Sequence, residues 1–176
     1  MENFSLYQRF RPSSFSEVVG QDHIVSVLQG AIKKNQIGHA YLFVGDRGLG
    51  KTSVARIFAK DLGVGKVDVI EIDAASHRGI DAIRILNEQV YSRPLESPYK
   101  VYIIDEVHML SSAAFNAFLK TLEEPPEHVK FVFATTEIRK VPVTVLSRCQ
   151  RFDLRRVDTK ELMDHFGNIA EKEGAD

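Results

Sequence analysis

The sequence contains one cysteine, almost no net charge and no long apolar run, and each absence excludes a kind of protein. Cys149 has no cysteine partner, which rules out an intrachain disulfide and a multi-cysteine metal site. The formal net charge of −1 gives the whole chain no strong attraction to nucleic acid. No apolar run approaches the roughly 18 residues of a membrane span, and the first residues lack the layout of a signal peptide. We therefore expect a soluble, cytoplasmic protein.

The composition is globular, with 44% apolar and 27% charged residues in 176 positions, enough for one domain with a proper core. The six histidines lack metal-ligand spacing, and we interpret each as a surface or packing residue. Charge is nevertheless uneven along the chain. Between residues 137 and 160, three acidic residues stand among seven basic ones that predict a local basic face: Arg139, Lys140, Arg148, Arg151, Arg155, Arg156 and Lys160.

One stretch carries the most specific pattern in the chain, the phosphate-binding motif G-x-x-x-x-G-K-[ST]. It is formed by Gly45, Asp46, Arg47, Gly48, Leu49, Gly50, Lys51 and Thr52, with Ser53 next in the chain. An apolar run at 41–44 precedes the motif and a helical pattern at 54–62 follows it, as a phosphate cradle requires. A plain glycine turn is the alternative, but the eight matching positions and both flanking segments argue against it.

The residue types of this motif suit a nucleotide phosphate. Glycines let backbone N–H groups turn inward, and the N-terminus of the following helix adds roughly half a positive charge toward a bound anion. We expect Lys51 to reach the β- and γ-phosphates and the Thr52 hydroxyl to ligate Mg²⁺.

The rest of the chain alternates apolar strands with amphipathic helices. After a helix that Asp22 caps and that ends near 35–38, strands are expected at 41–44, 67–72, 101–104, 131–134 and near 152–154. Ser111 or Ser112 should cap the helix that ends at the prolines 125–126, and a short helix should occupy 142–146. A last helix is expected to turn five apolar residues inward: Leu162, Met163, Phe166, Ile169 and Ala170.

This alternation predicts an α/β fold of three layers around a five-stranded parallel sheet. Ligands of such sheets bind at the carboxyl ends of the strands, and we expect all the candidate chemistry there. Asp105 follows the third strand, where a carboxylate holds Mg²⁺ beside a phosphate loop, and Glu106 is then free to polarise a water as a general base. The alternative is a solvated acidic turn.

Two further candidates follow from the same arrangement. Thr136, with Thr135 as the other candidate, ends the fourth strand, where a hydroxyl could bind the γ-phosphate or the attacking water. Arg148 could stabilise the charge that spreads during phosphoryl transfer, in cis or from a neighbouring subunit. Taken alone, strand-end threonines are commonly structural, and an exposed arginine is more often a solvated surface group.

An aromatic and basic lead-in without regular structure is expected at residues 4–19, before any periodic segment. A flat apolar strip beside a phosphate loop could cover the base of a nucleotide, or its aromatics could only cap the core. The candidates for contact with a base are Tyr7, Arg11, Pro12, Val18 and Val19.

Several segments together resemble the bacterial DNA polymerase III gamma/tau family, the clamp-loader ATPases of the AAA+ class. Besides the phosphate loop, the resemblance rests on residues 7–12 (YQRFRP), 19–21 (VGQ), 73–76 (DAAS), 100–110 (KVYIIDEVHML), 115–126 (FNAFLKTLEEPP) and 134–149 (ATTEIRKVPVTVLSRC). The run from 100 to 149 is specific to that family, whereas phosphate loops occur in many NTPases.

The resemblance implies a P-loop NTPase of the AAA+ type, with the strand order 5-1-4-3-2 and with ATP and Mg²⁺ as cofactors. It also implies a motor that, in a five-subunit ring with delta and delta-prime subunits, uses ATP to load a sliding clamp onto primer-template DNA.

The resemblance also gives roles to single residues. It makes Lys51 and Thr52 the Walker A pair, Asp105 and Glu106 the Walker B pair, and Thr136 the sensor of the γ-phosphate. The same resemblance makes Arg148 the arginine finger of a neighbour's site and the lead-in the adenine pocket. It places Arg78 and Arg84 against the DNA backbone, as contacts without sequence preference.

The chain departs from the family pattern in two places. Four zinc-binding cysteines usual in the family are absent from the short segment 61–66, so no zinc is predicted. Residues 1–157 are expected to form the nucleotide-binding core and 158–176 the start of a truncated lid, so that the chain by itself is monomeric and hydrolyses ATP poorly. The alternatives are a non-hydrolysing subunit like delta-prime and an ATPase like a small subunit of replication factor C.

Overall fold

The computed structural model describes residues 5–174, and these form a five-stranded, fully parallel sheet in the order β2-β3-β4-β1-β5. The strands are β1 (Ala40–Val44), β2 (Val69–Asp73), β3 (Lys100–Asp105), β4 (Val129–Thr135) and β5 (Gln150–Asp153). This confirms the expected fold class and the order 5-1-4-3-2. Residue 4 of the expected lead-in and the outer ends of the two expected domains lie outside the described residues.

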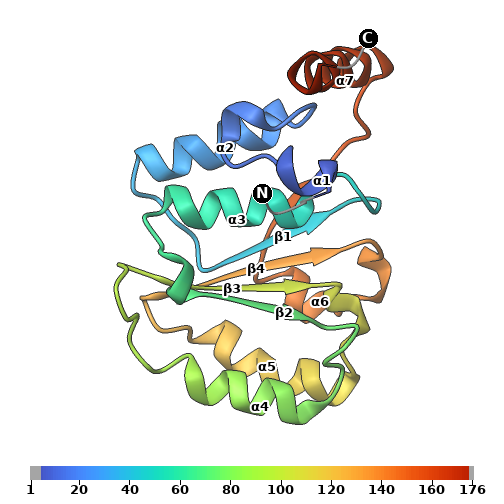
Figure 1. Cartoon of the computed structure of the whole chain (residues 1–176). Helices are drawn as coiled ribbons and strands as arrows, with labels where there is room; N and C mark the ends of the chain where they lie inside the picture. Colours follow the sequence, from blue (N-terminus) through green and yellow to red (C-terminus); the bar gives the residue numbers. More distant parts are fainter. Residues whose placement is uncertain (1–4, 175–176) are drawn as a thin grey trace.

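Helices cover both faces of the sheet, which gives the three expected layers (Figure 1). On one face, α2 (Asp22–Lys33) and α3 (Lys51–Asp61) pack on alternate residues of β1 and β3. On the other face lie α4 (Ile80–Gln89), α5 (Ser112–Glu123) and the short α6 (Val143–Leu146). The strands β1 and β4 are buried along their whole length; β1 is therefore apolar throughout, and β4 is apolar except for Lys130 and Thr135.

Burial of aromatic side chains fixes the position of β4 under α5. The ring of Phe118 meets Phe131 and Phe133 edge-on, with centroids 5.0 and 5.7 Å apart. Such pairs contribute about 0.5–1.5 kcal/mol beyond the area that they bury. Because the end of β4 carries Thr135 and leads into Thr136, this packing also sets where two candidate site residues lie.

The second strand begins two residues later than the sequence predicts. Residues Lys66–Asp68 form a 3-10 turn instead, because the buried carboxylate of Asp68 accepts the backbone N–H groups of Leu95, Glu96 and Ser97 at 2.6, 2.9 and 2.9 Å. These bonds satisfy a buried charge and hold the loop before β3 against the start of β2. The strand expected at 67–72 is in fact Val69–Asp73.

The N-cap residue of α2 differs from the predicted one, and that of α5 is one of the two predicted candidates. Gln21, rather than Asp22, is the N-cap residue of α2, because its fully buried side chain is committed to the backbone of Arg155 through two hydrogen bonds of 2.7 and 3.0 Å. For α5 the cap is Ser111, whose hydroxyl accepts the N–H of Ala114 at 3.1 Å.

The lead-in was expected to lack regular structure, and that prediction is wrong. A short helix, α1 (Leu6–Arg9), begins where the Ser5 N–H donates to Gln8 Oε1 at 3.3 Å, and a 3-10 turn follows at Phe15–Glu17. Among the aromatic residues at 5–19, only Phe15 is buried in the core under α2 and α3. A four-residue helix is too short to show the 3.6-residue period, so the sequence carries no periodic signal for it.

The last helix, α7 (Thr159–Glu173), does not turn its apolar residues inward. No residue of α7 is buried, and Met163 and Phe166 are 69% and 61% exposed. In Figure 1 the helix lies beyond α2 and α3, away from the sheet, and of its five apolar residues only Ile169 and Ala170 are half-buried. An amphipathic pattern shows that a helix has an apolar side but does not show that anything packs on it. None of the helices formed by residues 5–174 has the length and apolar character of a membrane span.

Two buried tyrosines provide a matched test of core stability. The Tyr102 hydroxyl, whose pKa burial raises to about 12, has no hydrogen-bond partner among the described residues, whereas the Tyr41 hydroxyl accepts the N–H of Gly38 at 2.7 Å. Tyr102→Phe is expected to keep or raise the free energy of unfolding, by up to about 1 kcal/mol, and Tyr41→Phe to lower it by about 1 kcal/mol. Urea unfolding at constant m-value measures both, and equal losses would contradict the prediction.

Candidate functional site

The glycine loop between β1 and α3 forms an open concave backbone. Gly48 and Gly50 have φ angles of +85° and +93°, a region that side chains other than glycine rarely adopt. A Cβ at either position would meet no atom within 4 Å, so the inner side of the loop is free. With the N-terminus of the eleven-residue helix α3 behind it, this loop has the shape and the polarity of an anion cradle.

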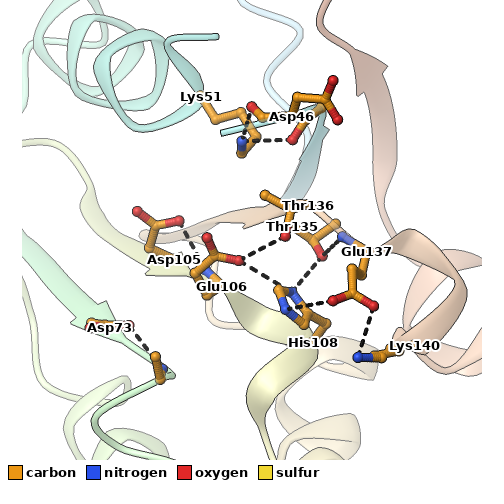
Figure 2. A network of polar contacts seen from close by, with 12 residues as sticks. Asp46, Lys51, Asp73, Asp105, Glu106, His108, Thr135, Thr136, Glu137 and Lys140 are labelled. Carbon is orange, nitrogen blue, oxygen red and sulfur yellow. Dashed lines mark hydrogen bonds and ion pairs between the residues drawn. The ribbon is translucent and has the colours of Figure 1, made fainter. Parts of the chain in front are cut away.

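Lys51 brings a buried positive charge into this cradle. Its side chain is buried, and Nζ donates to the backbone oxygens of Gly45 and Asp46 at 2.7 and 2.8 Å (Figure 2). Burial lowers the pKa of Lys51. Both acceptors are neutral carbonyl groups of the loop itself, so an anion in the cradle would give this ammonium group a stronger partner.

The metal-side candidates lie in direct contact. Thr52 Oγ1 donates to Asp105 Oδ2 at 2.7 Å, and this bond joins the start of α3 to the end of β3. Asp105 Oδ1 accepts the N–H of Glu106 at 2.9 Å. A hydroxyl and a carboxylate are hard oxygen donors of the kind that Mg²⁺ prefers. Within residues 5–174 no three His, Cys, Asp or Glu side chains gather around one point, so phosphate and water oxygens would complete the shell of such an ion.

Glu106 has an unusual backbone conformation next to the phosphate loop. Its φ angle is +49°, in the left-handed region that costs a residue with a side chain energy, and such residues cluster at functional sites. Thr136 Oγ1 donates to Glu106 Oε2 at 3.2 Å. The structure thus brings together Lys51, Thr52, Asp105, Glu106 and Thr136, which the sequence places on three separate strand ends.

Only part of the lead-in reaches this site. A cavity of about 240 Å³ is lined by Arg11, Arg47, Gly48, Gly50, Lys51, Thr52, Ser53, Asp105 and Glu106. Arg11 Nε donates to Ser53 Oγ at 3.0 Å, and burial, followed by the nearby charge of Arg56, lowers the pKa of Arg11. Pro12 lines a neighbouring hollow of about 800 Å³, Val18 packs on the core, Val19 is half-buried, and Tyr7 is 74% exposed.

The larger hollow between α3 and β2 is less suited to an anion than the phosphate loop, although it has cationic walls. Arg56 forms a two-bond ion pair with Glu71 at 2.5 and 2.6 Å, and Lys60 Nζ donates to the backbone oxygen of Ser13 at 3.0 Å. Arg56 is therefore already paired with a carboxylate that itself lines the hollow, whereas Lys51 has only neutral loop carbonyls as partners.

Arg148 lies at the opposite end of the sheet, which corrects the expectation that all the candidate chemistry shares one edge. It lines a hollow with Gly38, His39 and Ala40, at the amino end of β1, and its guanidinium contacts Glu123 at 2.5 Å. Since β5 is parallel to β1, the chain must return to the amino edge before β5 starts, and Arg148 is two residues before that strand. Its own phosphate loop is therefore out of reach.

The remaining basic candidates are on the surface. Arg78 Nε donates to the backbone oxygen of Ala75 at 3.0 Å, and Arg84 is 3.6 Å from Asp81. Four of the seven basic residues between 137 and 160 contact carboxylates, which weakens the expected basic face. These pairs are Lys140 with Glu137, Arg148 with Glu123, Arg151 with Asp153 and Arg156 with Asp46.

The residue that the sequence analysis missed is His108. Its side chain is 4% exposed and lies between Glu106, Thr135 and Glu137 (Figure 2). We had interpreted all six histidines as surface or packing residues. The available signal was its place three residues after Asp105, but only the pairing of β3 with β4 brings Thr135 and Glu137 beside it.

Comparison with curated proteins identifies relatives of nearly the whole chain. The DNA polymerase III subunit tau of Bacillus subtilis is 49% identical over 96% of the chain, and that of Escherichia coli is 46% identical over 96%. The chain belongs to the DNA polymerase III gamma/tau family. A family model described as "DNA polymerase III, delta subunit" also matches residues 20–69 and 64–158. The chain spans 34% and 29% of those two relatives, about a third of their length.

Solved structures confirm the fold of this gamma/tau family member as that of an AAA+ P-loop protein. The RuvB Holliday junction branch migration motor of Thermotoga maritima matches 94% of the chain and 55% of its own, with a TM-score of 0.77 and 22% identity. A DNA polymerase III gamma subunit-related protein of the same organism matches 82% of the chain and 52% of its own, with a TM-score of 0.67 and 25% identity.

Proposed function

We propose that the chain binds Mg-ATP and hydrolyses it to ADP and phosphate. The observation that carries the proposal is buried Lys51, which faces a glycine cradle beside the directly bonded pair Thr52 and Asp105. With a γ-phosphate in the cradle, the Lys51 ammonium group would donate to the phosphate oxygens instead of the backbone oxygens of Gly45 and Asp46. When bound, Mg²⁺ would neutralise phosphate charge, and Thr52 and Asp105 are the residues that would hold it.

Other residues of the chain would carry out the remaining roles in hydrolysis and in binding of the base. Glu106 accepts a proton from the attacking water as general base, and Thr136 orients the γ-phosphate or that water. Arg11 and its neighbours Tyr7, Pro12, Val18 and Val19 would border the base. Arg148 would act in the site of a neighbouring subunit, because it lies at the other end of the sheet.

In this proposal, residues 1–157 are the nucleotide-binding core and 158–176 the start of a lid. The 46–49% identity with tau subunits supports a role in clamp loading, in assembly with other gamma/tau, delta and delta-prime subunits, a sliding clamp and primer-template DNA. Arg78 and Arg84 would contact DNA phosphates, and the work would take place in the bacterial cytoplasm, where the chromosome is replicated.

Calorimetric titration with Mg-ATP tests the proposal on the chain and on Lys51→Ala. Loss of a charge-assisted contact worth about 1.5–3 kcal/mol should weaken ATP binding about 10- to 100-fold. Lys33→Ala, an exposed lysine of α2, is the control and should bind ATP within about twofold of the parent. Equal affinity in the parent chain and Lys51→Ala would exclude the phosphate loop as the binding site.

A second candidate function is a subunit that binds partners without hydrolysing ATP, and the match to the family model of the delta subunit favours it. The intact pairs Lys51 with Thr52 and Asp105 with Glu106 argue against it. Phosphate release in a single-turnover assay decides between them: a chain that binds Mg-ATP but releases no phosphate, even with partner subunits, would be the non-hydrolysing kind.

A further inference from the structure

His108 is a buried polar side chain directly beside the proposed general base. It lies in the 3-10 turn Val107–Met109 that follows β3, and its side chain is 4% exposed. Buried polar atoms are nearly always hydrogen-bonded, so both ring nitrogens need an explanation. One nitrogen, Nδ1, faces Thr135 and Glu106, and the other, Nε2, faces Glu137 (Figure 2).

The surroundings of Nδ1 determine which nitrogen carries the hydrogen. Nδ1 is 2.9 Å from Thr135 Oγ1 and 3.4 Å from Glu106 Oε2. The Thr135 hydroxyl can accept or donate, so the two carboxylates decide: Glu106 Oε2 is nearer to Nδ1, at 3.4 Å, than Glu137 Oε1 is to Nε2, at 4.0 Å, and a hydrogen is attracted more strongly at Nδ1. We therefore assign the hydrogen to Nδ1, where it is donated to Thr135 Oγ1 and lies close to Glu106 Oε2.

The contacts of Glu106 fall on one of its two oxygens. Oε2 accepts from Thr136 Oγ1 at 3.2 Å and faces His108 Nδ1, whereas Oε1 has no hydrogen bond among the described residues. A general base needs one oxygen fixed and the other free to take a proton from water. Thr136 follows β4 and His108 lies in the turn after β3, so a hydrogen bond and a close polar contact approach Oε2 from two elements.

On the Nε2 side, the His108 ring has only a distant polar contact. Nε2 is 4.0 Å from Glu137 Oε1, which is beyond hydrogen-bond distance. Glu137 is itself bound to Lys140 at 2.8 Å, and its N–H donates to Thr135 Oγ1 at 3.0 Å. The hydrogen bond from Lys140 lowers the pKa of Glu137. The ring thus has a close contact at Nδ1 and a distant one at Nε2.

We propose that His108 is a positioning residue for Glu106, which fixes Oε2 through Nδ1 and so directs Oε1 toward the attacking water. This inference rests on the proposed ATPase function. A histidine that only fills space would act through its size, whereas a positioning histidine acts through a donor at the place of Nδ1. The two roles therefore respond differently to substitutions that keep one nitrogen or the other.

Substitution of His108 by asparagine or by glutamine distinguishes the roles of the two ring nitrogens. The amide nitrogen of His108→Asn can take the place of Nδ1, and that of His108→Gln the place of Nε2, while His108→Leu keeps neither. In single-turnover hydrolysis with excess protein, we expect the rate to fall about 10- to 100-fold in the Leu and Gln variants, and within about threefold of the parent in the Asn variant. ATP affinity should change by less than about twofold in all three, since Glu106 acts on the chemical step.

Histidine replacement elsewhere provides the control. His77 is exposed in the loop after β2, and His77→Leu should leave both rate and affinity unchanged. Equal loss of rate in the Asn and Gln variants, or a loss of affinity at constant rate, would overturn the positioning role. Thermal unfolding of each variant shows whether a lower rate of hydrolysis results only from a smaller folded fraction.

A second measurement does not depend on hydrolysis. In nitrogen-15 spectra of the histidine rings, His108 should show the tautomer with hydrogen on Nδ1, and Glu106→Gln should shift that resonance. Glu88→Gln, an exposed carboxylate of α4, should not shift it. Hydrogen on Nε2, or no response to Glu106→Gln, would refute the inference. If the parent chain hydrolysed no ATP but these spectra agreed with the prediction, the proposed ATPase function would be refuted. The contact between His108 Nδ1 and Glu106 would still be confirmed.

Discussion

Arg148→Ala is expected to reduce ATP hydrolysis by about 10³- to 10⁵-fold in an assembly with partner subunits, the range that an arginine supplied in trans contributes elsewhere. The reason is geometric. Arg148 lies beside the amino end of β1, whereas the phosphate loop follows its carboxyl end, so the guanidinium can serve only another copy or subunit. Steady-state phosphate release by the assembled complex measures the effect.

Mixing two defective forms tests the in-trans role directly. Lys51→Ala subunits bind ATP only weakly but carry Arg148, and Arg148→Ala subunits have an intact phosphate loop. At an ATP concentration that leaves Lys51→Ala largely unoccupied, a mixture should regain activity that neither form has. Arg139→Ala, an exposed arginine after β4, is the matched control and should keep full activity. An inactive mixture, with both forms assembled, would refute the role of Arg148.

Glu106→Gln is expected to lower single-turnover hydrolysis about 10²- to 10⁴-fold, the usual contribution of a general base, while Mg-ATP still binds. Glutamine keeps the size of the side chain, and its carbonyl oxygen can accept from Thr136 at the place of Oε2, but it cannot take a proton from water. Rapid-quench measurement of ADP formation, with ATP affinity from calorimetry, separates the two effects.

The opposite pattern would exclude Glu106 as the base. A variant that binds ATP weakly but hydrolyses bound ATP at the parent rate would show that the carboxylate supports binding alone. Glu88→Gln on α4 is the control, because its side chain is exposed and contacts no site residue that the structure describes.

Much of the site could be predicted because each of its parts is formed by a few residues that are adjacent in the sequence. The loop from Gly45 to Thr52 needs only local backbone geometry, and Asp105 and Glu106 follow directly on an apolar run. Parallel strands then bring these separate ends to one edge. Lys51, Thr52, Asp105, Glu106 and Thr136 could accordingly be predicted to meet at this edge, whereas the contact of His108 with Glu106 could not.

Predictions failed where the deciding contact is remote in the chain. Gln21 displaced Asp22 as a cap because its side chain binds the backbone of Arg155, more than a hundred residues away. The apolar face of α7 was expected to pack inward, but periodicity cannot show what lies opposite it. The 3-10 turn before β2 forms because Asp68 accepts three N–H groups from the loop before β3.

By itself the sequence determined the α/β class, the phosphate loop and the identity of the residues at the strand ends, since local pattern and strand direction suffice for these. Tertiary structure alone decided that Arg148 lies at the far end of the sheet, that Arg11 reaches the loop while Tyr7 remains exposed, and that His108 contacts Glu106. The physical reason is that strand pairing and burial join residues from distant parts of the chain, and no pattern within one segment contains the other partner.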